Sequence, residues 1–179
     1  MKLRIALGVV AVAVSAAVAQ QPYAGMEARA IKTLSDQQIA DLQAGRGMGL
    51  ALAAELNGYP GPIHAIELAD KLGLSPDQIV RLKQLFEAMK SETIPLGAQL
   101  IGQERSLNDA FAEKSITLAS LESGTQQIGA TQAKLRAAHL KYHLSTVAVL
   151  TPEQIVRYNE LRGYAGGTPQ HQHMQHMHQ

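Results

Sequence analysis

Cysteine and tryptophan are absent from this chain, and phenylalanine occurs only at Phe86 and Phe111. Without cysteine the chain can form no disulfide, no thiolate metal site and no thiol nucleophile. The shortage of aromatic side chains leaves little material for a large closed core, because these residues usually bury the most surface. We therefore expect helices packed through aliphatic side chains, with a homodimer completing the core.

Sequence motifs for common enzyme classes are missing as well. The chain has no G-x-S-x-G nucleophile elbow, no P-loop, no H-E-x-x-H zinc-protease pattern and no dinucleotide-binding glycine cluster. Its carboxylates are scattered among lysines and arginines on charged helix faces. The formal charge is only +1, so neither a nucleic acid nor an anionic membrane is indicated as a partner. These absences predict a protein that is not an enzyme.

The first residues predict export. Lys2 and Arg4 precede a short apolar stretch over residues 5–14, and Ala17-Val18-Ala19 has the A-x-A pattern of a cleavage site. The alternative is a membrane-spanning anchor, but a span needs roughly 20 apolar residues, and this run is shorter. A lipid anchor would need a cysteine. We predict a signal peptide over residues 1–19, cleaved near Ala19, and a periplasmic protein with no membrane anchor.

Helix start and stop signals divide the remainder. A capping box at Ser35 and Gln38 predicts a short helix to about residue 45. An Ala- and Leu-rich stretch over 47–56 ends at the turn-forming residues 57–62. Further helices are predicted over 62–73, over 76–113, over about 118–150 and from 152 to about 163. Pro95 lies inside the longest of these and predicts a kink, because proline deletes one backbone hydrogen bond.

One short pattern occurs twice. Leu74-Ser75-Pro76-Asp77-Gln78 and Leu150-Thr151-Pro152-Glu153-Gln154 each place a hydroxyl residue before a helix and a glutamine three residues later. Ser75 and Thr151 are N-caps, proline takes the first helical position, and Gln78 and Gln154 close capping boxes. We therefore interpret the pattern as structural rather than as a binding site.

These two copies resemble the LTxxQ motif family of periplasmic proteins, which includes Spy, CpxP and ZraP and, more distantly, the metal sensor CnrX. The resemblance covers roughly residues 60–163 and implies an all-α fold: an elongated antiparallel hairpin of about four main helices that dimerises into a curved cradle. It also implies an ATP-independent chaperone, an envelope-stress modulator or a heavy-metal-responsive protein. The predicted organisation is a signal peptide (1–19), an extension with short helices (20–59), the LTxxQ-type domain (60–164) and a disordered tail (165–179).

The histidines are the candidate ligands. Four of the seven lie in the tail, interleaved with two methionines: His171, His173, Met174, His176, Met177 and His178. Imidazole suits Zn, Cu and Ni, and thioethers add a preference for Cu(I). The alternatives are a polar low-complexity end or an affinity tag, although the spacing and the methionines favour metal binding.

Three histidines lie elsewhere. His139 and His143 are four residues apart, which places both rings on one face of a helix where they could share a metal. Two partly buried histidines beside the helix seam are an equally good interpretation. His64, with Glu67 three residues later, forms a weaker pair. The resemblance to CnrX-like sensors implies metal ligands on the helices before both motifs, near His64 and His143, so the hairpin could bring these two together.

The sequence thus predicts a periplasmic metal-binding stress protein, acting as an ATP-independent chaperone for unfolded clients or as a heavy-metal resistance factor. Curvature at Pro95, with Met89, Leu96 and Leu100 as apolar contacts, would serve the chaperone role. The alternative is a metal-responsive sensing or inhibitory partner of a membrane sensor kinase, which would bind the sensor's periplasmic domain. A transition metal ion is the expected ligand in either case.

Overall fold

The computed structural model describes residues 23–164. The secondary-structure elements within this range are all helices. The predicted all-α hairpin fold is confirmed. The predicted signal peptide and the His/Met-rich tail lie outside the described residues. A short 3-10 helix (Met26–Ala28) is followed by α1 (Asp36–Gln43), α2 (Leu52–Glu55), α3 (Pro62–Glu67), α4 (Ala69–Leu72), α5 (Pro76–Ala112), α6 (Leu118–Val147) and α7 (Pro152–Arg162).

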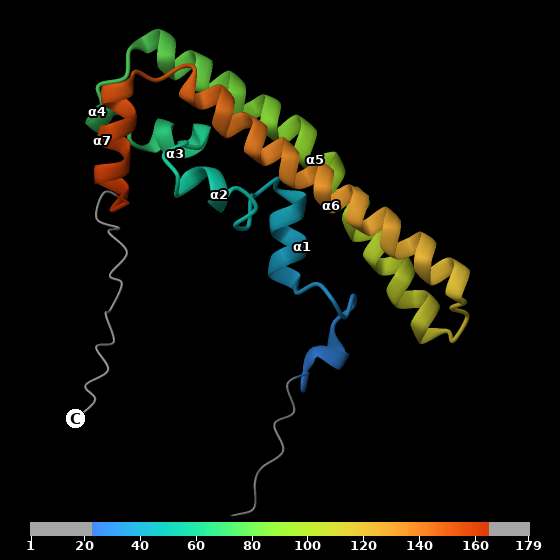
Figure 1. The fold of residues 1–179 in the computed structure, drawn as a ribbon. Coiled ribbons are helices and arrows are strands. Elements are labelled where there is room, and N and C mark those ends of the chain that lie inside the picture. Colours follow the sequence, from blue (N-terminus) through green and yellow to red (C-terminus); the bar gives the residue numbers. More distant parts are fainter. Residues whose placement is uncertain (1–22, 165–179) are drawn as a thin grey trace, which may run out of the picture.

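Helices α5 and α6 form the hairpin that organises the molecule (Figure 1). With 37 residues, α5 is about 55 Å long at 1.5 Å per residue. It passes Pro95 without interruption. Near this proline the Thr93 hydroxyl donates to the Met89 carbonyl, a side-chain bond that often bends helices. No helix in the described part of the chain is both long and apolar enough to cross a bilayer.

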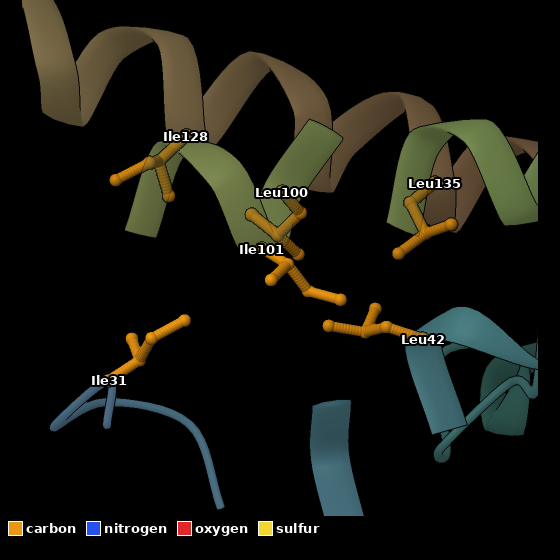
Figure 2. Close-up of a cluster of buried hydrophobic side chains, with 6 residues drawn as sticks. All are labelled: Ile31, Leu42, Leu100, Ile101, Ile128 and Leu135. Atoms are coloured by element: carbon orange, nitrogen blue, oxygen red, sulfur yellow. The ribbon is translucent and has the colours of Figure 1, made fainter. Parts of the chain in front are cut away.

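Residues 23–61, which we call the N-terminal segment, pack along one side of this hairpin (Figure 1). Ile31 and Leu42 from this segment meet Leu100 and Ile101 of α5 and Ile128 and Leu135 of α6 in one buried cluster (Figure 2). The two backbones come close at Gly97 of α5, where an added Cβ would overlap the Leu42 carbonyl of α1. The hairpin thus buries its apolar face against a segment of its own chain.

The two copies of the repeated pattern meet at the open end of the hairpin. Ser75 and Thr151 each cap a helix, and Gln78 and Gln154 each close the capping box. The two glutamines also bond to each other, with Gln78 Nε2 donating to Gln154 Oε1 at 2.8 Å and Gln154 Nε2 donating to Gln78 Oε1 at 3.1 Å. We call this pair the glutamine clamp. It joins the start of α5 to the start of α7, so the pattern has a structural role at both copies.

Several predicted details differ from the structure. The helix predicted over 47–56 is confined to α2, because Met48 and Gly49 have positive φ values that a helix does not allow. The helix predicted over 62–73 is divided into α3 and α4 at Leu68. Met89 and Leu100 are buried in the core, so the prediction that they contact clients is wrong.

Candidate metal-binding pocket

His64, His139 and His143 line one cavity of about 300 Å³. The cavity lies where the N-terminal segment and α3 meet the hairpin. His64 belongs to α3, whereas His139 and His143 belong to α6. Met48, Glu55 and Met89 line the same cavity. The structure therefore brings together all the histidines predicted outside the tail, from helices more than 70 residues apart in the sequence.

Local features of the chain make this convergence possible. His139 and His143 are both buried, one helical turn apart. Helix α3 begins with Pro62 at its first position, directly after Gly61. A Cβ on Gly61 would lie 3.0 Å from His143 Cε1 and 3.2 Å from His143 Nε2. Glycine at this position lets the start of α3 approach the His143 ring closely.

A backbone contact fixes the tautomer of His143. Its Nδ1 lies 2.6 Å from the Tyr59 carbonyl oxygen. Because a carbonyl oxygen only accepts, Nδ1 must carry a proton and donate it. In the neutral ring the lone pair is then on Nε2. Nε2, which lies near Gly61 beside the cavity, is therefore the nitrogen of His143 that can bind a cation.

His139 has a free nitrogen. Its Nε2 is buried and has no hydrogen-bond partner among the described residues. Burial, together with the nearby charge of His143, lowers the pKa of His139, so the neutral ring is favoured. An unpaired buried polar atom is costly. A bound ion would remove that cost.

Glu55 holds the centre of a polar network beside the histidines. Tyr158 and Tyr164 donate their hydroxyls to its Oε1, and the Gly61 amide donates to its Oε2 at 3.2 Å. His64 Nδ1 lies 3.4 Å from Oε1, and His143 Nδ1 lies 3.7 Å from Oε2.

The same network sets the charge of this carboxylate. Burial by itself would raise the pKa of Glu55, but the nearby His64 ring, the hydrogen bond from Tyr158 and the charges of His64 and His143 lower it to about 2. Burial and the neighbouring carboxylate raise the pKa of Tyr158. Glu55 is therefore a carboxylate at neutral pH, and Tyr158 keeps its proton for the hydrogen bond.

Glu55 was not among the residues singled out from the sequence. Glu67, which the spacing paired with His64, is exposed and does not line the cavity. The sequence contains only a weak indication of a role for Glu55, which is the only charged residue between Arg46 and His64. A lone acid in an apolar, glycine-rich stretch must find buried partners or remain at the surface.

The side chains around the cavity fit a transition metal ion. Imidazole nitrogens are common ligands of Zn, Cu and Ni, and thioethers add affinity for soft ions. In the part of the chain that the structure describes, His139 Nε2 is buried without a partner, and the Nδ1 contact of His143 leaves its lone pair on Nε2. Among the described residues, no three His, Asp or Glu side chains already have the arrangement of a metal centre. The ligands would therefore need side-chain rotation to close around an ion.

Comparison with known proteins gives one match. Residues 62–162 match the family model described as LTXXQ motif family protein. This region begins at α3 and ends with α7, so it includes His64, His139, His143 and both copies of the repeated pattern. Glu55 and Met48 precede it. No curated protein and no solved structure matches the chain.

Proposed function

Because the chain belongs to the LTXXQ motif family over residues 62–162, we propose that it is a periplasmic, non-enzymatic stress protein that binds a transition metal ion and serves heavy-metal resistance. One observation carries this proposal: histidines from two distant segments converge on one cavity, and a buried nitrogen of His139 lacks a partner within residues 23–164. The predicted export sequence and the His/Met-rich tail support the same function.

Each side chain would have a distinct role in binding. His64, His139 and His143 would supply imidazole nitrogens to the ion. Glu55 would act through its neighbours, since a carboxylate beside a ligating imidazole fixes the ring and increases its basicity. The ion itself would supply no catalytic step; it would be stored or withheld from other proteins.

Calorimetric metal titration tests the proposal. Metal binding by the tail has to be removed by substitution, so that the chain keeps its full length. We define a tail-silent protein as the full chain carrying His171→Asn, His173→Asn, His176→Asn, His178→Asn, Met174→Leu and Met177→Leu. We expect it to bind one equivalent of Zn(II) or Cu(II), whereas the unmodified chain binds more.

Adding His139→Asn to the tail-silent protein should abolish this single equivalent. Gln126→Asn, at an exposed position on the same helix, is the matched control and should leave binding unchanged. Unfolding midpoints measured without metal show whether either variant has lost its fold. A tail-silent protein that binds no metal would refute the pocket as a metal site.

A chaperone role remains part of the proposal. Large apolar side chains are exposed at several described positions, including Val80, Phe111, Leu118, Leu144 and Val156, and such side chains can contact unfolded clients. Equimolar protein should suppress aggregation of a reduced client. If it fails with and without metal, the protein serves metal resistance alone. Homodimerisation also stays a prediction, and light scattering would test it.

A signalling role is the second candidate. The cavity is lined by residues from both the N-terminal segment and the hairpin, so a bound ion would link two parts of the molecule. Metal occupancy could then change a surface that a periplasmic sensor domain recognises. A pull-down with sensor domains, in the presence and absence of Zn or Cu, distinguishes this role from storage.

A further inference from the structure

The ligand set of the pocket is nearly neutral, because Glu55 is already engaged. Its carboxylate accepts hydrogen bonds from Tyr158, Tyr164 and the Gly61 amide, and Arg162 Nε lies 3.6 Å from it. Binding a metal directly through Glu55 would break bonds to buried donors, which is costly. The imidazoles and any neighbouring uncharged donors are left to bind the ion.

Two thioethers complete the lining of this cavity. Met89 of α5 is buried beside it, and Met48 lies in the loop between α1 and α2. The same loop lies against His139: a Cβ on Gly47 would lie 3.5 Å from His139 Nδ1. Methionine sulfur is a soft ligand that selects Cu(I) over the harder divalent ions.

The backbone at Met48 is a second, independent observation. Met48 has a φ of 43°, which lies in the left-handed region that a residue with a Cβ rarely adopts. Gly49, next to it, has a positive φ as well. Non-glycine residues in this region are strained and occur often at ligand clamps. Met48 is exposed and lines the cavity in this conformation, although glycine would fit the backbone better.

We propose that the pocket selects copper(I), with thioether sulfur from Met48 and Met89 joining the imidazoles of His64, His139 and His143. This inference rests on the proposed function, since it names the ion that the same pocket binds. A monovalent soft cation suits uncharged nitrogen and sulfur donors. Glu55 would balance the positive charge of the ion without binding it directly.

Competition titrations in the tail-silent protein test the selectivity. Copper(I) would be supplied anaerobically in complex with bicinchoninate, and Zn(II) would be measured against a chromophoric chelator. We expect Met48→Leu combined with Met89→Leu to weaken copper(I) binding at least about tenfold, because only the soft ion depends on sulfur. Zn(II) affinity should stay within about twofold. Leucine nearly conserves the volume of methionine.

Met26→Leu, in the 3-10 helix and away from the cavity, is the matched control and should change neither affinity. X-ray absorption should detect a sulfur neighbour of copper in the tail-silent protein and none after both pocket substitutions. Unchanged copper(I) affinity in the double variant, or equal losses for both ions, would overturn the selectivity. If the selectivity is overturned but Zn(II) still binds, the proposed function is retained. Absence of all binding refutes both.

Discussion

Gly97 offers a sharp test of how the N-terminal segment is held on the hairpin. A Cβ at this position would lie 2.9 Å from the carbonyl carbon of Leu42 and closer still to its oxygen. Both atoms belong to the α1 backbone, which cannot rotate away as a side chain could. Gly97→Ala should therefore push α1 away from α5 and loosen the cluster around Leu42.

The expected change in the free energy of unfolding follows from two opposing effects. Alanine in a helix interior is favoured over glycine by about 0.8–1 kcal/mol, whereas overpacking a closed contact costs about 1–3 kcal/mol. Because a backbone must move, we expect the clash to exceed the propensity gain, so that Gly97→Ala lowers the free energy of unfolding by up to about 2 kcal/mol.

Gly102→Ala provides the matched control on the same helix. A Cβ there would meet nothing within 4 Å, so only the propensity gain of about 0.8–1 kcal/mol remains. Urea unfolding of the full chain, followed by circular dichroism, measures both variants. If Gly97→Ala is as stable as Gly102→Ala, α1 does not pack on α5 as described.

The other predictions concern the glutamine clamp, Glu55 and metal loading. Gln78→Ala and Gln154→Ala should each lower the unfolding free energy by about 1–2 kcal/mol, and the double variant should lose less than the sum because the bonds are shared; additive losses would contradict the clamp. In metal-free protein, Glu55→Gln should be destabilising at neutral pH. The stability difference between the two proteins should shrink as pH falls from about 4.5 toward 2. The reason is that Glu55 has a pKa of about 2 in the folded state, so the unfolded chain takes up the proton first. A stability difference independent of pH would contradict the depressed pKa. Metal loading should slow amide hydrogen exchange in α3, and unchanged exchange would contradict an ion that bridges α3 to α6.

The features that the sequence predicted correctly depend on local chemistry. Ser75 and Gln78 act within three residues of each other, so a capping box is visible in the sequence. The long helices follow from apolar residues recurring at helical spacing. The spacing of His139 and His143 likewise showed that both rings share a face of α6.

The unpredicted features depend on contacts between distant segments. Glu55 accepts a hydrogen bond from Tyr158, which lies 103 residues further along the chain. No local sequence pattern predicts such a pairing. The approach of Leu42 to Gly97 and the bonds between Gln78 and Gln154 are similar cases. Sequence spacing showed which residues could pair along one helix, whereas the packing of the N-terminal segment decided which of them share a pocket.

The glutamine clamp also bears on the order of folding. The turn between α5 and α6 joins residues close in sequence, so the hairpin can close from that end with little loss of chain entropy. Gln78 and Gln154 are 76 residues apart, and they meet at the opposite end, after the hairpin has closed. Substitutions in the clamp should therefore accelerate unfolding and leave the folding rate nearly unchanged. The repeated pattern would thus set how long the folded protein persists rather than how fast it forms.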